Sequence, residues 1–315
     1  MTLRMSTREG FGQGLLAVGR ERSDVVVVAA DTGKSMKTNY FAAEFPDRVF
    51  DTGIAEQDMV LVAAGLATTG KVAFATTYAT LATLRACEQI RSFVAYPRLN
   101  VKVVAGMSGL TGDLEGVTHQ GIEDVGVMRS IPNMTVVCPA DGIAAKKAVK
   151  AIADHPGPVY MRVGRNDTPV VYTEEMEFRL GEVVVHRDGG DDVAILASGL
   201  ALPIALEAEK LLAEEGVKAK VAEVHTLKPI NTEAVVELAR ATGAIVTVED
   251  HNVIGGLGSA VAEVLGEHYP CRLKRVGIPD CFTESAPYEE LLEAYGISAA
   301  AVSRAAKEVA QEKRR

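Results

Sequence analysis

Short apolar runs rich in valine recur along this chain, and longer stretches of helical pattern separate them. Within each run the hydrophobicity is continuous rather than alternating, which is typical of parallel strands that helices cover on both faces. A chain patterned in this way is expected to fold into layered α/β structure. The predicted strands are residues 25–30, 72–77, 101–105, 135–138, 159–163, 193–197, 220–224 and 244–249.

This pattern is interrupted near the middle of the chain. Residues 168–192 contain a proline, a charged stretch and a turn-prone Asp-Gly-Gly sequence. A length of 315 residues also suits two domains better than one. We therefore expect two doubly wound α/β domains. They are residues 1–175 and 176–315, with predicted helices at 201–214 and 233–241 in the second.

Composition narrows the possible functions. The apolar fraction of 48% and the charged fraction of 24% are those of an ordinary globular protein. A net charge of -9 argues against a surface for nucleic acid or for an acidic membrane. No apolar run approaches the roughly 18 residues that cross a bilayer, and the first residues lack the hydrophobic stretch of a signal peptide. We expect a cytoplasmic protein with a solvated basic tail at residues 313–315.

The cysteines show no sign of a metal site. Cys87, Cys138, Cys271 and Cys281 form no CxxC pair, and no cluster of His and Cys has the spacing of metal ligands. We expect buried free thiols and no metal ion held by this chain.

The segment GIAEQD at residues 53–58 opens a predicted helix whose continuation, residues 59–67, carries no polar side chain. A helix without a polar face belongs in a core or in a subunit interface. Glu56, in the first turn, has two interpretations. Its carboxylate can complement the helix dipole, or in apolar surroundings it can give and take a proton.

The segment GVTHQG at residues 116–121 follows a predicted strand. The carboxyl ends of parallel strands form the ligand crevice of open α/β sheets. His119 is there either an acid or base, or a side chain that hydrogen-bonds its own loop. A further segment, GGLG at 255–258, precedes a helix, but its spacing is not the dinucleotide fingerprint, so tight packing of the turn is the better interpretation.

Taken together, these segments resemble the transketolase family over nearly the whole chain. The matching pieces are AADTGKSMKTNYFAAEFPDRVFDTGIAEQDM, CEQIRSFVAYPRLNVKVVAG, GVTHQGIEDVGVMRSIPNMTVVCPAD, VEDHNVIGGLGSAVAEVL and YEELLEAYGIS. The resemblance implies a pyrimidine-binding domain of the thiamine-diphosphate fold, followed by the family's C-terminal domain. The family's other half carries a GDG motif and a downstream Asn that hold magnesium. It has no counterpart here, because Gly112-Asp113-Leu114 breaks the motif.

The resemblance implies that thiamine diphosphate lies between this chain and a partner. Glu56 matches the glutamate that bonds the aminopyrimidine ring nitrogen and favours the imino tautomer, from which the thiazolium carbon is deprotonated. Tyr78 and Leu81 match aromatic positions beside the pyrimidine, and Asp31 falls among the cofactor-binding positions. Mg²⁺ is expected on an N-terminal transketolase subunit that carries the diphosphate-binding domain.

The same resemblance implies the substrate residues. His119 is expected to face the substrate hydroxyls or carbonyl, while Arg8, Ser35 and Arg165 fall on positions that grip a sugar phosphate. The implied reaction moves a two-carbon ketol unit from a ketose phosphate to an aldose phosphate, as in the pentose phosphate pathway.

The sequence departs from the family at two of these positions. Met107 replaces a histidine near the phosphate, and Glu115 stands at the aspartate that reads the donor's hydroxyl. Other thiamine-diphosphate activities therefore stay open, namely an apulose-phosphate-type transketolase, a deoxyxylulose-phosphate synthase and the beta subunit of a 2-oxo-acid dehydrogenase. A non-catalytic scaffold subunit is a further alternative, and the retained Glu56 and His119 argue against it.

The expected assembly is a heterotetramer. In it, this chain associates with a second copy of itself through its pyrimidine domain and with the N-terminal subunit.

Overall fold

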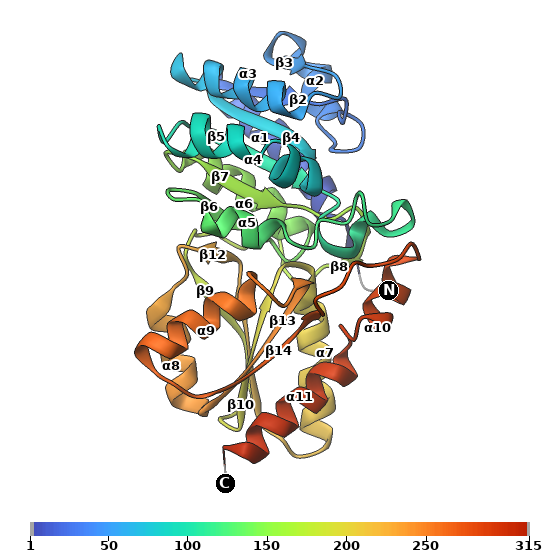
Figure 1. Ribbon diagram of the computed structural model, residues 1–315, viewed down its shortest axis with the longest axis vertical. Coiled ribbons are helices and arrows are strands. Elements are labelled where there is room, and N and C mark those ends of the chain that lie inside the picture. Colours follow the sequence, from blue (N-terminus) through green and yellow to red (C-terminus); the bar gives the residue numbers. More distant parts are fainter. Residues whose placement is uncertain (1–2, 314–315) are drawn as a thin grey trace.

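The computed structural model describes residues 3–313, which form two α/β domains stacked along the long axis of the molecule (Figure 1). Arg314 and Arg315 of the basic tail lie outside the described residues. Within residues 3–313, none of the helices combines the length and the apolar character needed to cross a bilayer.

A seven-stranded sheet forms the centre of the first domain. In spatial order its strands are β12 (Thr226–Lys228), β6 (Thr135–Val137), β7 (Val159–Arg162), β5 (Val101–Gly106), β4 (Val72–Tyr78), β2 (Val25–Ala29) and β3 (Val49–Asp51). All neighbouring pairs are parallel except β12 and β6. The edge strand β12 comes from the second half of the sequence, so the two halves share this sheet.

Helices cover both faces of this sheet because side chains on its central strands are buried on both sides. In β2, Val25 and Val27 pack with Phe11, while Val26 and Val28 pack with Met59 on the opposite face. The Phe11 face carries α1 (Thr7–Glu21), α2 (Asn39–Glu44) and α6 (Gly142–Asp154). The Met59 face carries α3 (Glu56–Thr68), η2 (Leu81–Arg85), α4 (Cys87–Gln89), η3 (Ile90–Ala95) and α5 (Asp124–Ser130).

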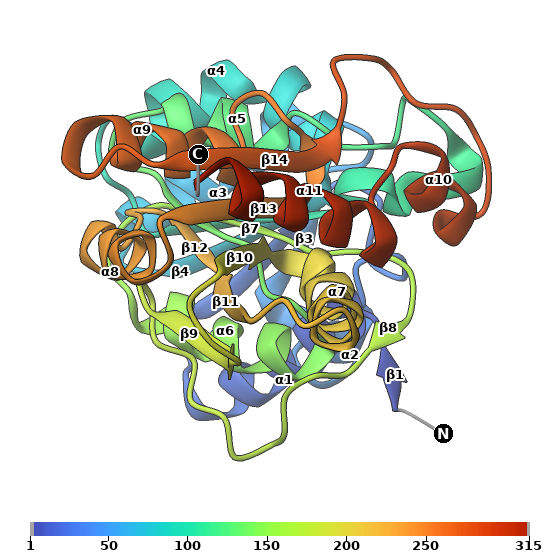
Figure 2. The same cartoon turned by 90° about the horizontal axis from the view of Figure 1, so that it is seen from below.

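The second domain has a five-stranded sheet in the order β14 (Arg272–Ile278), β13 (Ala244–Asn252), β10 (Val193–Ser198), β11 (Ala219–Val224) and β9 (Val183–Asp188). Only β9 runs antiparallel to its neighbour. One face is covered by α7 (Leu202–Glu214) and α11 (Ala299–Glu312), and the other by α8 (Thr232–Thr242) and α9 (Leu257–His268) (Figure 2). The remaining elements are β1 (Arg4–Met5), η1 (Pro46–Arg48), η4 (Gly109–Glu115), β8 (Thr168–Pro169), η5 (Gly199–Ala201) and α10 (Tyr288–Ala294).

The predicted α/β class is confirmed, and every predicted strand and helix is present within three residues at each end. The pattern missed β1, β3, β8, β9, β12 and β14. Of these, β9 and β14 are edge strands with exposed positions, so their side chains are not continuously apolar. The chain leaves the first sheet before β9 and returns to it later as β12. A domain boundary at residue 175 therefore stays a proposal.

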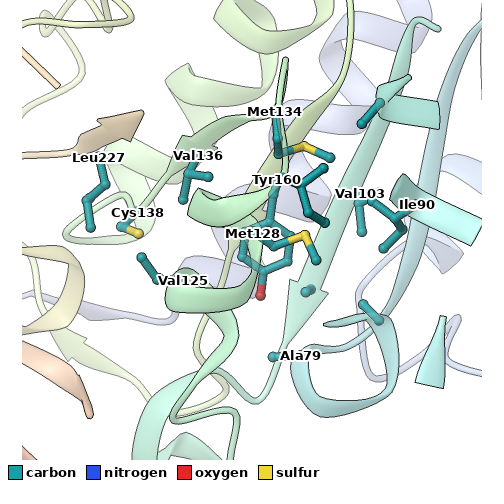
Figure 3. Close-up of a cluster of buried hydrophobic side chains, with 14 of the residues drawn as sticks. Ala79, Ile90, Val103, Val125, Met128, Met134, Val136, Cys138, Tyr160 and Leu227 are labelled. Atoms are coloured by element: carbon teal, nitrogen blue, oxygen red, sulfur yellow. The ribbon is translucent and has the colours of Figure 1, made fainter. Parts of the chain in front are cut away.

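Apolar packing joins the two domains. A single buried cluster extends from Val26 and Val103 in the first sheet to Leu196 and Val224 in the second. Figure 3 shows part of it, with Leu227 of β12 beside the first sheet and the Tyr160 ring among apolar neighbours. The domains are therefore expected to unfold together.

A buried polar network reinforces this junction. The Arg162 Nε and Nη2 atoms donate to the two carboxylate oxygens of Asp124, each at 3.0 Å, and the Tyr160 hydroxyl donates to the same carboxylate at 2.5 Å. Arg162 Nη1 donates to the backbone carbonyl of Asp250 in the second domain. Burial opposes the charge on Arg162, but Asp124 and the other acidic neighbours raise the pKa of the guanidinium above its ordinary value.

The strand end of β13 supplies three further buried groups. Burial raises the pKa of Glu249 to about 7 and that of Asp250 to about 6, and it lowers the pKa of His251 to about 4. The Glu249 carboxylate accepts from the amides of Leu257 and Gly258 at the start of α9. A Cβ on Gly256 would lie 1.9 Å from this carboxylate, so the prediction of tight packing in the GGLG segment is confirmed.

Candidate functional site

The carboxyl edge of the first sheet gathers the residues that the sequence singled out. Ser35 follows β2, Tyr78 ends β4, Glu115 and His119 follow β5, and Arg165 follows β7. Because β2, β4, β5 and β7 are neighbours and parallel, their following loops meet at one edge.

His119 lies at the centre of this edge. Its ring centroid is 5.5 Å from that of Tyr78, and its Nε2 atom is 3.6 Å from a carboxylate oxygen of Glu115. Its Nδ1 atom lies 2.9 Å from the Thr118 hydroxyl. The side chain is one-third exposed, so one side of the ring is held by its loop while the other is accessible to a ligand.

Two guanidiniums, those of Arg8 and Arg165, lie at the same edge of the sheet, and Glu115 links Arg165 to His119. The backbone amide of Arg8, at the start of α1, donates to the carbonyl of Gly164, which places Arg8 next to Arg165. Arg8 Nη1 donates to the carbonyl of Ser35, and its buried Nε has no partner. Burial and the neighbouring Arg165 charge lower the pKa of Arg8 below its ordinary value. Two close cations with a free donor suit an anion.

The Arg165 guanidinium already has acidic partners. Its Nη1 donates to a Glu115 carboxylate oxygen and lies 3.9 Å from Asp113. The Asp113 carboxylate in turn accepts from the amide of Leu114 and from the Asn166 side chain. The broken GDG segment is therefore folded back on its own loop. Within residues 3–313, no group of three or more His, Cys, Asp or Glu side chains is arranged to hold a metal ion.

Glu56 forms a second part of the edge. It is the first residue of α3, it is 1% exposed, and one carboxylate oxygen accepts from Arg85 Nη1 at 2.7 Å. A cavity of about 310 Å³ opens beside it, with Ile54 and Leu61 in its wall. Arg85 belongs to η2, so this ion pair fixes η2 against α3. Nothing in the sequence pattern marked Arg85.

Asp31 and Leu81 lie on the same side as Glu56. Asp31 is exposed with a positive φ of 54°, and its amide donates to the Asp51 carboxylate, which also accepts from the amide of Gly53. This shared acceptor ties the loop after β2 to the loop before Glu56. Leu81 begins η2 and is partly exposed. The structure records no contact of Asp31, Leu81 or Glu56 with the His119 group.

Gln120 connects the histidine loop to the second domain. Its buried side-chain amide donates to the carbonyls of Asp113 and Glu284, and its oxygen accepts from the Thr283 hydroxyl. Gln120 belongs to the GVTHQG segment, but the sequence indicated no role for its side chain. Its partners could not be found from sequence because Glu284 is 164 positions away.

The apolar face of α3 is only partly covered in the single chain. Met59, Val60 and Ala63 are buried, whereas Leu61 and Gly65 are exposed. Further exposed apolar side chains surround the same region, namely Ile54, Leu84, Phe93 and Tyr96. The helix is therefore not enclosed in a core within the single chain, and the predicted subunit interface is the alternative left to cover its exposed side.

Met107, the cysteines and a larger cavity are the remaining features that bear on the predicted site. Met107 is buried with a positive φ of 52°, so it packs inside the domain. All four cysteines are free, but only Cys138 is buried as expected. Cys87 and Cys271 are partly buried, and Cys281 is exposed in the loop after β14. A larger cavity of about 750 Å³ lies between β8 and α7, lined by Val171, Leu200 and Ile204, and none of the candidate site residues lines it.

The chain is a two-domain α/β protein with polar side chains gathered at the carboxyl edge of its first sheet. Comparison with known proteins identifies its family. The model of the transketolase pyrimidine binding domain matches residues 4–170, and that of the transketolase C-terminal domain matches residues 181–302. The chain belongs to the transketolase family, as a C-terminal section that carries these two domains.

Individual relatives match over nearly their full length. A protein from Methanocaldococcus jannaschii described as a transketolase C-terminal section is 43% identical over 94% of this chain and 94% of its own. The 6-deoxy-6-sulfo-D-fructose transketolase subunit SqwH from Clostridium sp. (strain MSTE9) is 43% identical over 97% and 95%. A solved structure described as a split gene transketolase, inactive beta4 tetramer, has a TM-score of 0.92 and 47% identity, covering 98% of this chain and 99% of that chain.

Proposed function

We propose that this chain is the C-terminal subunit of a thiamine-diphosphate-dependent transketolase that transfers a two-carbon ketol unit between sugar phosphates. The observation that carries the proposal is the buried carboxylate of Glu56 at the start of α3, beside a cavity whose wall includes exposed Ile54 and Leu61. A buried acid next to uncovered apolar surface is half of a binding site, and a partner subunit would supply the other half.

The residues on this edge fit the pyrimidine end of thiamine diphosphate. An aminopyrimidine ring needs a carboxyl group for its ring nitrogen and apolar or aromatic walls. Glu56 supplies the first, and Tyr78 and Leu81 supply the second, with Asp31 on the neighbouring loop. When bound, the cofactor supplies the carbanion chemistry, and the protein sets its tautomer and orientation.

The His119 group is the substrate end of the proposed site. His119 can exchange a proton with a substrate hydroxyl or carbonyl, and the tilted Tyr78 ring restricts its position. Arg8 and Arg165, with Ser35, would hold the substrate phosphate. Leu114 breaks the GDG motif in this chain, which supports the proposal that an N-terminal partner subunit holds Mg²⁺ and the diphosphate.

The proposed assembly is a heterotetramer. The exposed apolar side chains around α3 support self-association or partner binding through the first domain. The related split gene transketolase described as an inactive beta4 tetramer supports the view that such chains associate without becoming active.

Reconstitution tests the proposal. We expect the purified chain to associate with itself, to bind thiamine diphosphate and Mg²⁺ undetectably in calorimetry, and to be inactive. Mixing it with a GDG-bearing N-terminal transketolase subunit should restore cofactor binding and ketol transfer together. Tight, magnesium-dependent cofactor binding by the chain alone would refute the need for a partner. A reconstituted complex that binds the cofactor but transfers no ketol unit would instead support a scaffold role.

The Gln120 bridge leads to a prediction about the second domain. Gln120→Leu removes the bonds that hold the His119 loop, and displacement by about 1 Å can cost roughly a hundredfold in rate. We expect kcat of the assembled enzyme to fall about tenfold to a hundredfold, with unchanged cofactor affinity. Thr283→Val, in the second domain, should lower kcat in the same direction but less.

Gln13→Leu, at an exposed position of α1, is the matched control and should leave kcat unchanged. If Gln120→Leu and Thr283→Val lower only the thermal unfolding midpoint, Gln120 supports the fold and not the position of His119.

A second candidate is the transfer from a sulfonated ketose. It is favoured by one relative, the 6-deoxy-6-sulfo-D-fructose transketolase subunit, which is 43% identical to this chain. Rates of the reconstituted complex with phosphorylated and sulfonated ketose donors decide between the two candidates.

A further inference from the structure

The corner formed by Arg8 and Arg165 brings two guanidiniums together with acidic neighbours, Glu115 and Asp113 at Arg165 and Asp167 near Arg8. The two guanidiniums are close enough for Arg165 to lower the pKa of Arg8. Arg8 Nε is buried and has no partner, so at least one donor of this corner is unused. A donor left unpaired in a buried position is costly unless a ligand completes it.

Glu115 is the nearest acidic partner of Arg165. One of its carboxylate oxygens accepts from Arg165 Nη1, and the other lies 3.6 Å from His119 Nε2. The Glu115 side chain is 37% exposed and that of Arg165 is 36% exposed. The pair is therefore accessible to solvent and is not locked in a core. A substrate anion that reaches Arg165 must share this guanidinium with Glu115 or displace it.

We propose that Glu115 is a specificity-determining residue that acts as an internal counter-anion. In the free chain its carboxylate pairs with the Arg165 guanidinium. This pairing lowers the preference of the anion corner, formed by Arg8 and Arg165, for a phosphate dianion over a singly charged sulfonate. This inference rests on the proposed function, because it assumes that Arg8 and Arg165 bind the charged end of the substrate.

The charge argument gives the direction of the effect. The Coulomb energy between Glu115 and a bound anion is proportional to the product of their charges, so a dianion is repelled about twice as strongly as a monoanion. Glu115 therefore weakens phosphate binding more than sulfonate binding. Asp113 also faces Arg165, but its carboxylate is bound by Leu114 and Asn166 and stays in place.

Two small probes of similar shape test this on the full-length chain without the partner. Methyl phosphate is doubly charged at about pH 8, since the second pKa of a phosphate ester is about 6, and methanesulfonate is singly charged. Calorimetric titration in a low-salt buffer gives their affinities for wild type and Glu115→Gln. We expect Glu115→Gln to bind methanesulfonate about threefold and methyl phosphate about tenfold more tightly, because doubling the energy squares the ratio.

Glu44→Gln is the matched control. Glu44 pairs with Arg20 elsewhere on the surface, and its side chain is 40% exposed. The Glu44→Gln variant should bind both probes with the affinities of wild type. Thermal unfolding checks that every variant is folded.

Three outcomes would contradict the inference, and they are distinguishable. Equal gains for the two probes would show that Glu115 blocks the corner sterically without selecting by charge. No gain for either probe would overturn the inference but leave the anion corner intact. Failure of wild type and Glu115→Gln to bind either probe would remove Arg8 and Arg165 as the anion site, and with them the proposed sugar-phosphate specificity.

Discussion

Replacing Glu56 with Gln is expected to lower kcat of the reconstituted enzyme by about a thousandfold or more. The amide keeps the shape of the side chain and can still accept from Arg85, so the pairing of α3 with η2 is retained. It cannot exchange the proton that the carboxyl group shares with the cofactor ring in the proposed mechanism. Steady-state rates at saturating cofactor measure the loss, and calorimetry reports cofactor affinity, which should weaken only modestly.

Glu223→Gln is the control for this experiment. Glu223 is also fully buried, but it lies in β11 of the second domain, where it accepts from the Tyr172 hydroxyl. We expect kcat within about twofold of wild type, since Glu223 bonds Tyr172 in the second half of the chain and contacts none of the proposed cofactor or substrate residues. Near-normal activity of Glu56→Gln at saturating cofactor would show that the role proposed for Glu56 is wrong.

Removing the Asp124 carboxylate is expected to destabilise the fold by about 3 to 5 kcal/mol. Asp124→Ala leaves the buried Arg162 guanidinium without its counter-ion and the Tyr160 hydroxyl without its acceptor. An unpaired buried charge costs more than the pair contributes, because its desolvation is no longer offset. Because Arg162 also bonds the Asp250 carbonyl, the loss should affect both domains in one transition.

Urea unfolding followed by circular dichroism measures this change in the free energy of unfolding. Glu44→Ala, which breaks an exposed ion pair with Arg20, should cost far less than Asp124→Ala. The double variant Asp124→Leu/Arg162→Met removes both charges and should be less destabilised than Asp124→Ala alone. A cost for Asp124→Ala no larger than that of Glu44→Ala would mean that the Arg162 network does not hold the junction.

The strands that could be predicted from the sequence are those whose residues are buried along the whole strand. β2 and β10 are buried along their whole length, so their sequences are apolar at every position. β14 is mostly exposed, and its sequence RLKRVGI has no continuous apolar run. β12 spans only Thr226–Lys228, and its position at the edge of the first sheet is set by pairing with β6. Such pairing depends on distant residues and leaves no local periodicity.

The candidate site was predictable to a similar extent. Glu56 and His119 stand in motifs that the resemblance could match, and the loops that carry them lie where parallel strands end. Arg85 and Gln120 had no such signal, since their importance comes from partners in other elements. That Glu115 faces the donor's hydroxyls stays a prediction, and the contact of its carboxylate with Arg165 had no signal in the sequence.

The sequence by itself determined the α/β class, the positions of eight strands and of a few helices along the chain, and the transketolase resemblance. These depend on local composition and on motifs, which remain readable without knowing what packs against them. Only the tertiary structure decided that Glu115 lies against Arg165, 50 positions away, and that Gln120 bonds Glu284 in the other domain. The spatial order of the strands differs from their order in sequence, so the loops that meet at the carboxyl edge are brought together by sheet pairing and domain packing, which no single segment encodes.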